Sequence, residues 1–88
     1  MGEGERGTER ILIVDDRELV RFVMERALEK LGFACEVSVA ENGREALEAV
    51  EERDFDLVIT DLRMPGLDGV QLTEEMRARG VDAAVVWI

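Results

Sequence analysis

The sequence predicts an α/β fold in which helices wind onto both faces of one parallel sheet, in the order βαβαβαβ. Two observations favour this fold. Short runs of apolar and β-branched residues alternate with segments of helical periodicity, and the connections between them are short. Such alternation is typical of parallel sheets joined by right-handed crossovers. The 88 residues are enough for one domain.

The first residues are polar. From Met1 to Arg10 the chain is rich in Gly and Glu and has no apolar side chain after Met1. We expect a flexible acidic tail over residues 1–10 and a domain over residues 11–88. Ile11 to Val14 is a continuous apolar run, which predicts a buried strand. Asp15 and Asp16 follow its carboxyl end.

Apolar side chains next recur with the period of a helix, from Arg17 onward. The residues expected on its inner face are Val20, Val23, Met24, Ala27, Leu28 and Leu31. Asp16 is a candidate N-cap of this helix, and Gly32 is a candidate stop signal. Residues 35–40 then alternate between apolar and polar side chains, which predicts a half-exposed strand at a sheet edge. The one cysteine, Cys35, lies in this strand and is interpreted as a small buried apolar residue.

A second helix and a third strand follow. Asn42 and Gly43 end the second strand, and a short helix is predicted from Arg44 to Arg53. Its expected inner face consists of Ala46, Leu47 and Val50. The run from Leu57 to Thr60 predicts a strand that is buried on both faces, and the dipeptide at 65–66, Pro-Gly, predicts the turn after it.

The last predicted elements are a third helix and a fourth strand. Asp68 is a candidate cap for a helix that ends at Gly80. Its expected inner face consists of Val70, Leu72, Thr73 and Met76. Residues 83–88 are apolar throughout, which predicts the fourth strand.

The chain is acidic, because 11 Lys and Arg stand against 21 Asp and Glu, for a net charge of −10. This charge argues against nucleic acid and anionic membranes as direct partners. Histidine is absent, which excludes histidine-based catalysis and disfavours transition-metal sites. No apolar run approaches bilayer length, and the amino terminus lacks the apolar core of a signal peptide. We therefore expect a cytoplasmic protein.

Three carboxylates are expected to meet at one edge of the sheet. Asp15 and Asp16 follow the first strand, and Asp61 follows the third. Parallel strands point their carboxyl ends to the same edge, so these side chains converge if the two strands are neighbours. Like charges at such proximity oppose folding, and a hard divalent cation such as Mg²⁺ removes the conflict. An aspartate beside the cation can then act as a nucleophile toward a phosphoryl group. The alternative is that Asp16 and Asp68 are only helix caps.

Three motifs resemble the receiver domain of response regulators in two-component signalling. They are residues 11–16 (Ile-Leu-Ile-Val-Asp-Asp), 40–46 (Ala-Glu-Asn-Gly-Arg-Glu-Ala) and 61–69 (Asp-Leu-Arg-Met-Pro-Gly-Leu-Asp-Gly). The resemblance implies a flavodoxin-like doubly wound sheet with strand order 2-1-3-4. It also implies that Asp61 receives a phosphoryl group from a histidine kinase or a phosphotransfer protein. The implied Mg²⁺ ligands are Asp15, Asp16, Asp61 and the backbone carbonyl of Arg63. The side chain of Arg63 is expected over the phosphoryl site.

The resemblance ends with the fourth strand. In the family that strand ends in a Ser or Thr, and a fifth strand ending in Lys and two more helices follow; this sequence contains none of these after Ile88. We therefore expect an incomplete receiver domain, with residues 83–88 as an exposed edge that favours self-association. The alternative is a phosphorylation-silent interaction module, or a fragment that a partner or a second copy completes.

Enzymatic turnover is not expected beyond the chain's own Mg²⁺-dependent phosphorylation and dephosphorylation. A phosphohydrolase with an aspartate nucleophile needs a second carboxylate two residues after the nucleophile. That position is Arg63 in this sequence, which disfavours such an enzyme.

Overall fold

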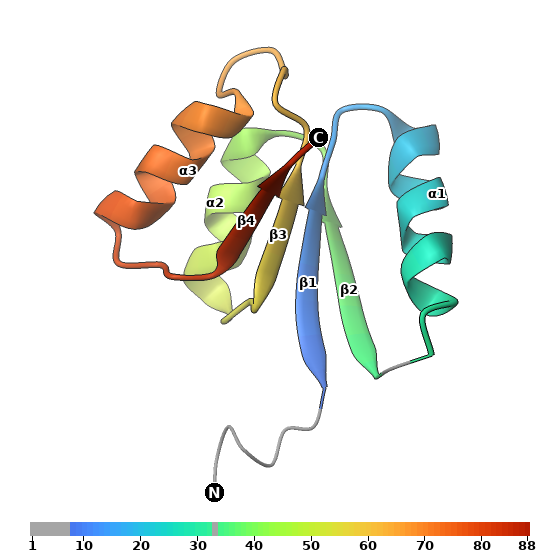
Figure 1. Ribbon diagram of the computed structural model, residues 1–88. Helices are drawn as coiled ribbons and strands as arrows, with labels where there is room; N and C mark the ends of the chain where they lie inside the picture. The colour runs from blue at the N-terminus through green and yellow to red at the C-terminus, as the bar shows by residue number, and fades with distance from the viewer. Residues whose placement is uncertain (1–7, 33) are drawn as a thin grey trace, which may run out of the picture.

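The computed structural model describes residues 8–32 and 34–88, and these form a sheet with helices on both sides (Figure 1). The predicted alternation is confirmed. The elements are β1 (Glu9–Val14), α1 (Glu18–Glu29), β2 (Cys35–Ala40), α2 (Gly43–Glu52), β3 (Leu57–Thr60), α3 (Gly69–Ala78) and β4 (Ala84–Trp87).

All strand pairs are parallel, and the strand order is β2-β1-β3-β4, as the resemblance implied. Helix α1 lies on one face of the sheet, and α2 and α3 lie on the other (Figure 1). This arrangement is the doubly wound fold. Val14, the last residue of β1, is in register with Ala40 of β2 and with Thr60 of β3. The residues that follow β1 and β3 therefore emerge at the same edge of the sheet.

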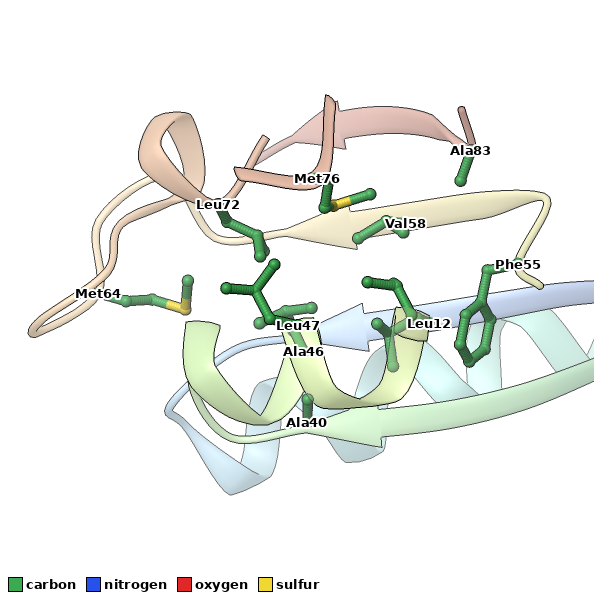
Figure 2. Packing of buried hydrophobic residues seen from close by; sticks show 12 residues of the cluster. Leu12, Ala40, Ala46, Leu47, Phe55, Val58, Met64, Leu72, Met76 and Ala83 are labelled. Carbon is green, nitrogen blue, oxygen red and sulfur yellow. The ribbon is translucent and has the colours of Figure 1, made fainter. Parts of the chain in front are cut away.

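The hydrophobic core lies between the sheet and helices α2 and α3 (Figure 2). Its buried members are Leu12, Val14, Ala40, Ala46, Leu47, Val50, Phe55, Val58, Met64, Leu72, Met76 and Ala83. The predicted inner face of α2 is confirmed, since its three apolar positions all belong to this cluster. Helix α3 contributes Leu72 and Met76, but Val70, also expected inward, is 38% exposed.

The face of the sheet that carries α1 is less completely covered. Helix α1 packs against β1 and β2 and has no buried residue of its own. Val23 and Leu31 were expected on its inner face and are 54% and 59% exposed. Leu57 and Ile59 of β3 are only half-buried, so the prediction of a strand buried on both faces is wrong for this face. The reason is the lateral position of α1, which covers one half of the sheet.

The predicted boundary between the tail and the first strand differs from the structure. Strand β1 begins at Glu9, so Glu9 and Arg10 belong to the sheet rather than to the expected tail. The amide of Glu9 donates to the Ala34 carbonyl at 3.1 Å, and the amide of Arg10 donates to Asp56 Oδ2 at 2.8 Å. Thr8 precedes this strand, and residues 1–7 of the predicted tail lie outside the described residues.

The predicted caps have different outcomes. Asp68 caps α3 as expected: its side chain accepts from the Gln71 amide at 2.8 Å, and the Gln71 side chain accepts from the Asp68 amide at 3.0 Å. Asp16 does not cap α1, because the N-cap residue is Arg17, and the Arg17 amide donates to Asp15 instead. Cys35 is only half-buried. None of the three helices in the described ranges is long and apolar enough to cross a membrane.

Candidate functional site

Asp15, Asp16 and Asp61 lie together at the carboxyl edge of the sheet. Each offers a carboxylate oxygen, and these oxygens all lie within 4.8 Å of one another. The backbone brings them together by extending the ladder one residue past the strands. The Asp15 amide donates to the Ala40 carbonyl at 3.1 Å, and the Asp61 amide donates to the Val14 carbonyl at 2.9 Å. The convergence predicted from the parallel topology is therefore present.

The three carboxylates differ in their access to solvent. The side chain of Asp15 is fully buried, that of Asp61 is 14% exposed, and Asp16 is exposed. Solvent exposure therefore increases across the site, from Asp15 at its base to Asp16 at its rim. Asp61 lies between these extremes and retains a route to solvent. A reagent approaching from outside can reach Asp61 without passing through the core.

Arg17 contacts two of the three carboxylates. Its Nε donates to Asp15 Oδ1 and its Nη2 to Asp15 Oδ2, both at 3.0 Å. The same Nη2 lies 3.4 Å from Asp61 Oδ2. A two-point guanidinium–carboxylate pair is among the strongest hydrogen-bonded ion pairs in proteins. Arg17 was not among the predicted site residues, although a basic residue directly after the acidic pair was a visible signal.

These contacts shift the ionisation of both partners. Burial acts to raise the pKa of Asp15, but hydrogen bonds from the Arg17 side chain and amide, with the charges of Arg17 and Arg21, outweigh it and lower that pKa. The pKa of Arg17 is raised, chiefly by its hydrogen bond to Asp15. Asp15 is therefore ionised at neutral pH in spite of its burial, which leaves both oxygens able to accept bonds.

The Asp61 carboxylate is oriented by the loop that follows β3. The Arg63 amide donates to Asp61 Oδ1 at 3.2 Å, while the Arg63 side chain is exposed. The role expected of the Arg63 carbonyl as a metal ligand stays a prediction. The hydroxyls of Thr60 and Thr73 are directed elsewhere, because they donate to the carbonyls of Asp61 and Gly69 at 3.0 and 2.8 Å.

Gly69 packs against the backbone of Asp61 and was not singled out by the sequence argument. Its amide donates to the Leu62 carbonyl at 3.0 Å. A Cβ at this position would lie 2.7 Å from the Asp61 carbonyl oxygen, so only glycine fits without displacement. The first residue of α3 thus supports the strand end that carries Asp61. The signal in the sequence was the glycine directly after the helix cap at Asp68.

The donor set suits a hard cation. Three carboxylates within reach of one another are oxygen ligands of the kind Mg²⁺ takes in proteins, where one or two carboxylates combine with waters and phosphate oxygens. The chain has no histidine, and its one cysteine lies at the start of β2, the opposite end of that strand from the acidic edge. Softer metals therefore have no nitrogen or thiolate ligand at this edge.

Comparison with known proteins identifies the family. The model of the response regulator receiver domain matches residues 11–88. The DNA-binding transcriptional regulator NtrC of Escherichia coli K12 is 41% identical over 69 residues, which is 78% of this chain and 14% of NtrC. The chain therefore spans only a small part of this relative.

Solved structures agree with this family. The response regulator TrrA of Thermotoga maritima, in complex with Mg²⁺-BeF, matches with a TM-score of 0.79 and 39% identity, over 88% of this chain and 65% of TrrA. TrrA in complex with the histidine kinase ThkA matches with a TM-score of 0.80 and 38% identity, over 90% of this chain and 66% of TrrA. The chain thus spans about two thirds of TrrA.

Proposed function

The chain belongs to the response regulator receiver domains of two-component signalling, and on this basis we propose that Asp61 is its phosphoacceptor. The observation that carries the proposal is the convergence of Asp61 with Asp15 and Asp16 at one edge of the sheet. Of the two carboxylates that Arg17 contacts, Asp61 is the one with solvent access, which a nucleophile toward an external donor requires.

The proposed reaction is transfer of a phosphoryl group from a phosphohistidine. A carboxylate oxygen of Asp61 attacks phosphorus, the phosphorus–nitrogen bond breaks, and the imidazole nitrogen leaves with the bonding electrons. The Arg63 amide holds the carboxylate through Oδ1 and limits its rotation. Gly69 fixes the backbone beneath it. The product is an acyl phosphate on Asp61.

Asp15, Asp16 and Asp61 would hold Mg²⁺, with the backbone carbonyl of Arg63 as a further ligand. When bound, the ion supplies positive charge that offsets the repulsion between the carboxylates and the incoming phosphoryl group. The solved complex of TrrA with Mg²⁺-BeF supports this assignment by similarity.

The proposed partner is a histidine kinase or a phosphotransfer protein. The solved complex of TrrA with ThkA, a histidine kinase, supports it. Under this proposal the chain acts in the cytoplasm and binds neither nucleic acid nor membrane directly. It turns over no separate substrate, because the phosphoryl group is accepted by its own Asp61 carboxylate and is then lost by hydrolysis.

A second candidate function is a phosphorylation-silent interaction module. Two observations favour it. The hydroxyls of Thr60 and Thr73 donate to backbone carbonyls rather than to the Asp61 carboxylate. Strand β4 is an end strand, and its residues Val86 and Trp87 are 46% and 50% exposed. Such an edge favours pairing with a second copy.

Intact-mass spectrometry separates the two functions. The folded chain is incubated with acetyl phosphate and MgCl₂ beside Asp61→Asn, which keeps the size of the side chain and removes the nucleophile. The phosphoacceptor proposal predicts one phosphoryl group on the wild type and none on the variant. An unmodified wild type that circular dichroism shows to be folded supports the silent module, and equal modification of the variant excludes Asp61 as the acceptor.

A further inference from the structure

Arg17 places a positive charge among the carboxylates of the acidic cluster. Its Nη2 lies 3.0 Å from Asp15 Oδ2 and 3.4 Å from Asp61 Oδ2. One guanidinium nitrogen therefore bridges the carboxylates that end two neighbouring strands. It offsets one of the three negative charges that the cluster carries when all its members are ionised.

This position conflicts with a bound metal ion. Mg²⁺ requires its oxygen ligands at about 2.0–2.1 Å and tolerates little deviation from octahedral geometry. Asp15 and Asp61 would hold the ion through carboxylate oxygens, and Nη2 already contacts one oxygen of each, Oδ2, at 3.0 and 3.4 Å. Two cations that touch the same oxygens also repel each other. The guanidinium and the ion therefore exclude one another.

Arg17 is free to leave without a change of fold. Arg17 is the N-cap residue of α1, and its side chain is 59% exposed. None of the residues of α1 is buried. The Arg17 amide donates to Asp15 Oδ1 at 2.9 Å, and this backbone contact does not depend on the guanidinium. Arg21 still donates to the Asp15 carbonyl at 2.7 Å. The backbone at the end of β1 therefore stays supported.

We propose that Arg17 is a built-in counter-ion of this cluster, which stabilises the metal-free site and competes with Mg²⁺ for Asp15 and Asp61. The inference rests on the proposed function, because it takes the acidic cluster as the metal site. Arg17 thereby regulates metal occupancy. The affinity for Mg²⁺ is lower because its binding must break the contacts of Arg17 with Asp15 and Asp61.

The test is a calorimetric titration of the full chain with MgCl₂. We compare the wild type with Arg17→Ala, and with Arg17→Lys, which keeps the charge but loses the two-point contact. The matched control is Arg26→Ala, which removes one positive charge from an exposed position farther along the same helix. Arg17→Ala is expected to bind Mg²⁺ about three- to tenfold more tightly than the wild type, the range for a partly exposed charged contact. The Mg²⁺ affinity of Arg17→Lys is expected to lie between those of the wild type and Arg17→Ala. The affinity of Arg26→Ala is expected to stay within about twofold of that of the wild type.

A second readout is the urea midpoint of unfolding. Without Mg²⁺, Arg17→Ala is expected to unfold at lower urea than the wild type, because its carboxylates lack a counter-ion. At saturating MgCl₂ the two midpoints should meet, because the ion has replaced Arg17 in both proteins. A midpoint difference that Mg²⁺ leaves unchanged means that Arg17 is only a structural contact, and overturns the proposal.

The outcomes distinguish the inference from the function on which it rests. Equal or weaker Mg²⁺ binding by Arg17→Ala, with clear binding by the wild type, overturns the competition and leaves the metal site intact. Absence of binding in both folded proteins removes the metal site itself. Mg²⁺ binding by Arg17→Ala with no detectable binding by the wild type supports the proposal, because Arg17 then prevents binding altogether.

Discussion

The carboxylates of Asp15 and Asp61 are neighbours because the residues before them, Val14 and Thr60, are register partners in the parallel pair of β1 and β3. This relationship is topological. A shift of the register by one residue would turn the side chains to opposite faces and separate the two carboxylates. The chemistry proposed for the site therefore depends on the pairing of β1 with β3, and the buried apolar residues of both strands fix that pairing.

Asp16→Ala is predicted to weaken Mg²⁺ binding by at least about tenfold, because removal of even an indirect partner of a metal ligand has an effect of that size. Asp16 is exposed, and no shift of stability is expected from its loss. The measurement is titration with MgCl₂ in a calorimeter. The exposed Asp82, outside the cluster, provides the matched control as Asp82→Ala. Unchanged affinity in Asp16→Ala would remove this residue from the metal site.

The stability of the metal-free chain is predicted to depend on Asp15 at acid pH. The pKa of Asp15 is lowered below its ordinary value of 3.8 in the folded chain. Between the two values the unfolded chain binds more protons than the folded one, so the free energy of unfolding rises with pH there. The contribution of ionised Asp15 is thus complete above about pH 4 and is lost as the pH falls through the folded value.

The comparison is urea unfolding of the wild type and Asp15→Asn in EDTA, from pH 6 down to pH 2.5. The advantage of the wild type should be constant at the upper end and shrink below about pH 4. An advantage that grows on acidification would mean that Asp15 has the opposite shift.

Gly69→Ala is predicted to destabilise the chain by about 1–3 kcal/mol, the usual cost of forcing atoms into a packed region. The new Cβ would lie 2.7 Å from the Asp61 carbonyl oxygen, which belongs to the backbone and cannot rotate away. Alanine alone would favour the helix by about 1 kcal/mol, so a net loss identifies the clash. Val70→Ala, at the next and more exposed position, is the control for urea unfolding. A Gly69→Ala chain as stable as the wild type would show that the loop moves freely.

Trp87→Lys is predicted to reduce self-association, because it places a charge on the end strand of the sheet. Trp87 is 50% exposed, and its Nε1 donates to Thr73 Oγ1 at 3.0 Å. Sedimentation velocity over a range of concentrations measures the effect. Val70→Lys puts the same charge on α3, where the native side chain is 38% exposed. Sedimentation profiles that match for the wild type and both variants would argue against β4 as the interface.

The fold was largely predictable because two of its strands are visible in the sequence as short apolar runs. The runs from Ile11 to Val14 and from Leu57 to Thr60 are each followed by aspartate, and the parallel pairing of β1 with β3 brings those ends together. The cap at Asp68 was predictable because both bonds of its capping box join residues that are close in the sequence.

The features that escaped prediction depend on tertiary placement. Val23 follows the helical period, yet it is exposed, since α1 packs against β1 and β2 alone among the elements with several contacts to it. Leu31 lies beyond the end of α1 at Glu29 and is exposed as well. Asp16 has the residue type of an N-cap, but the helix begins one residue later, so Arg17 is the N-cap residue and its amide donates to Asp15. Arg17 has a long side chain that could reach several acidic neighbours, and only the position of β3 beside β1 selects Asp61. No periodicity encodes these choices.

Chemical trapping distinguishes Asp61 from the other two carboxylates as the residue that carries the phosphoryl group. Borohydride reduces an aspartyl phosphate to homoserine, which marks the modified position permanently. The chain is phosphorylated with acetyl phosphate and MgCl₂, reduced, digested and sequenced by mass spectrometry. We expect homoserine at position 61 and unmodified aspartate at positions 15 and 16. Homoserine at position 15 or 16 with Asp61 intact, or no homoserine in a folded chain, would contradict it.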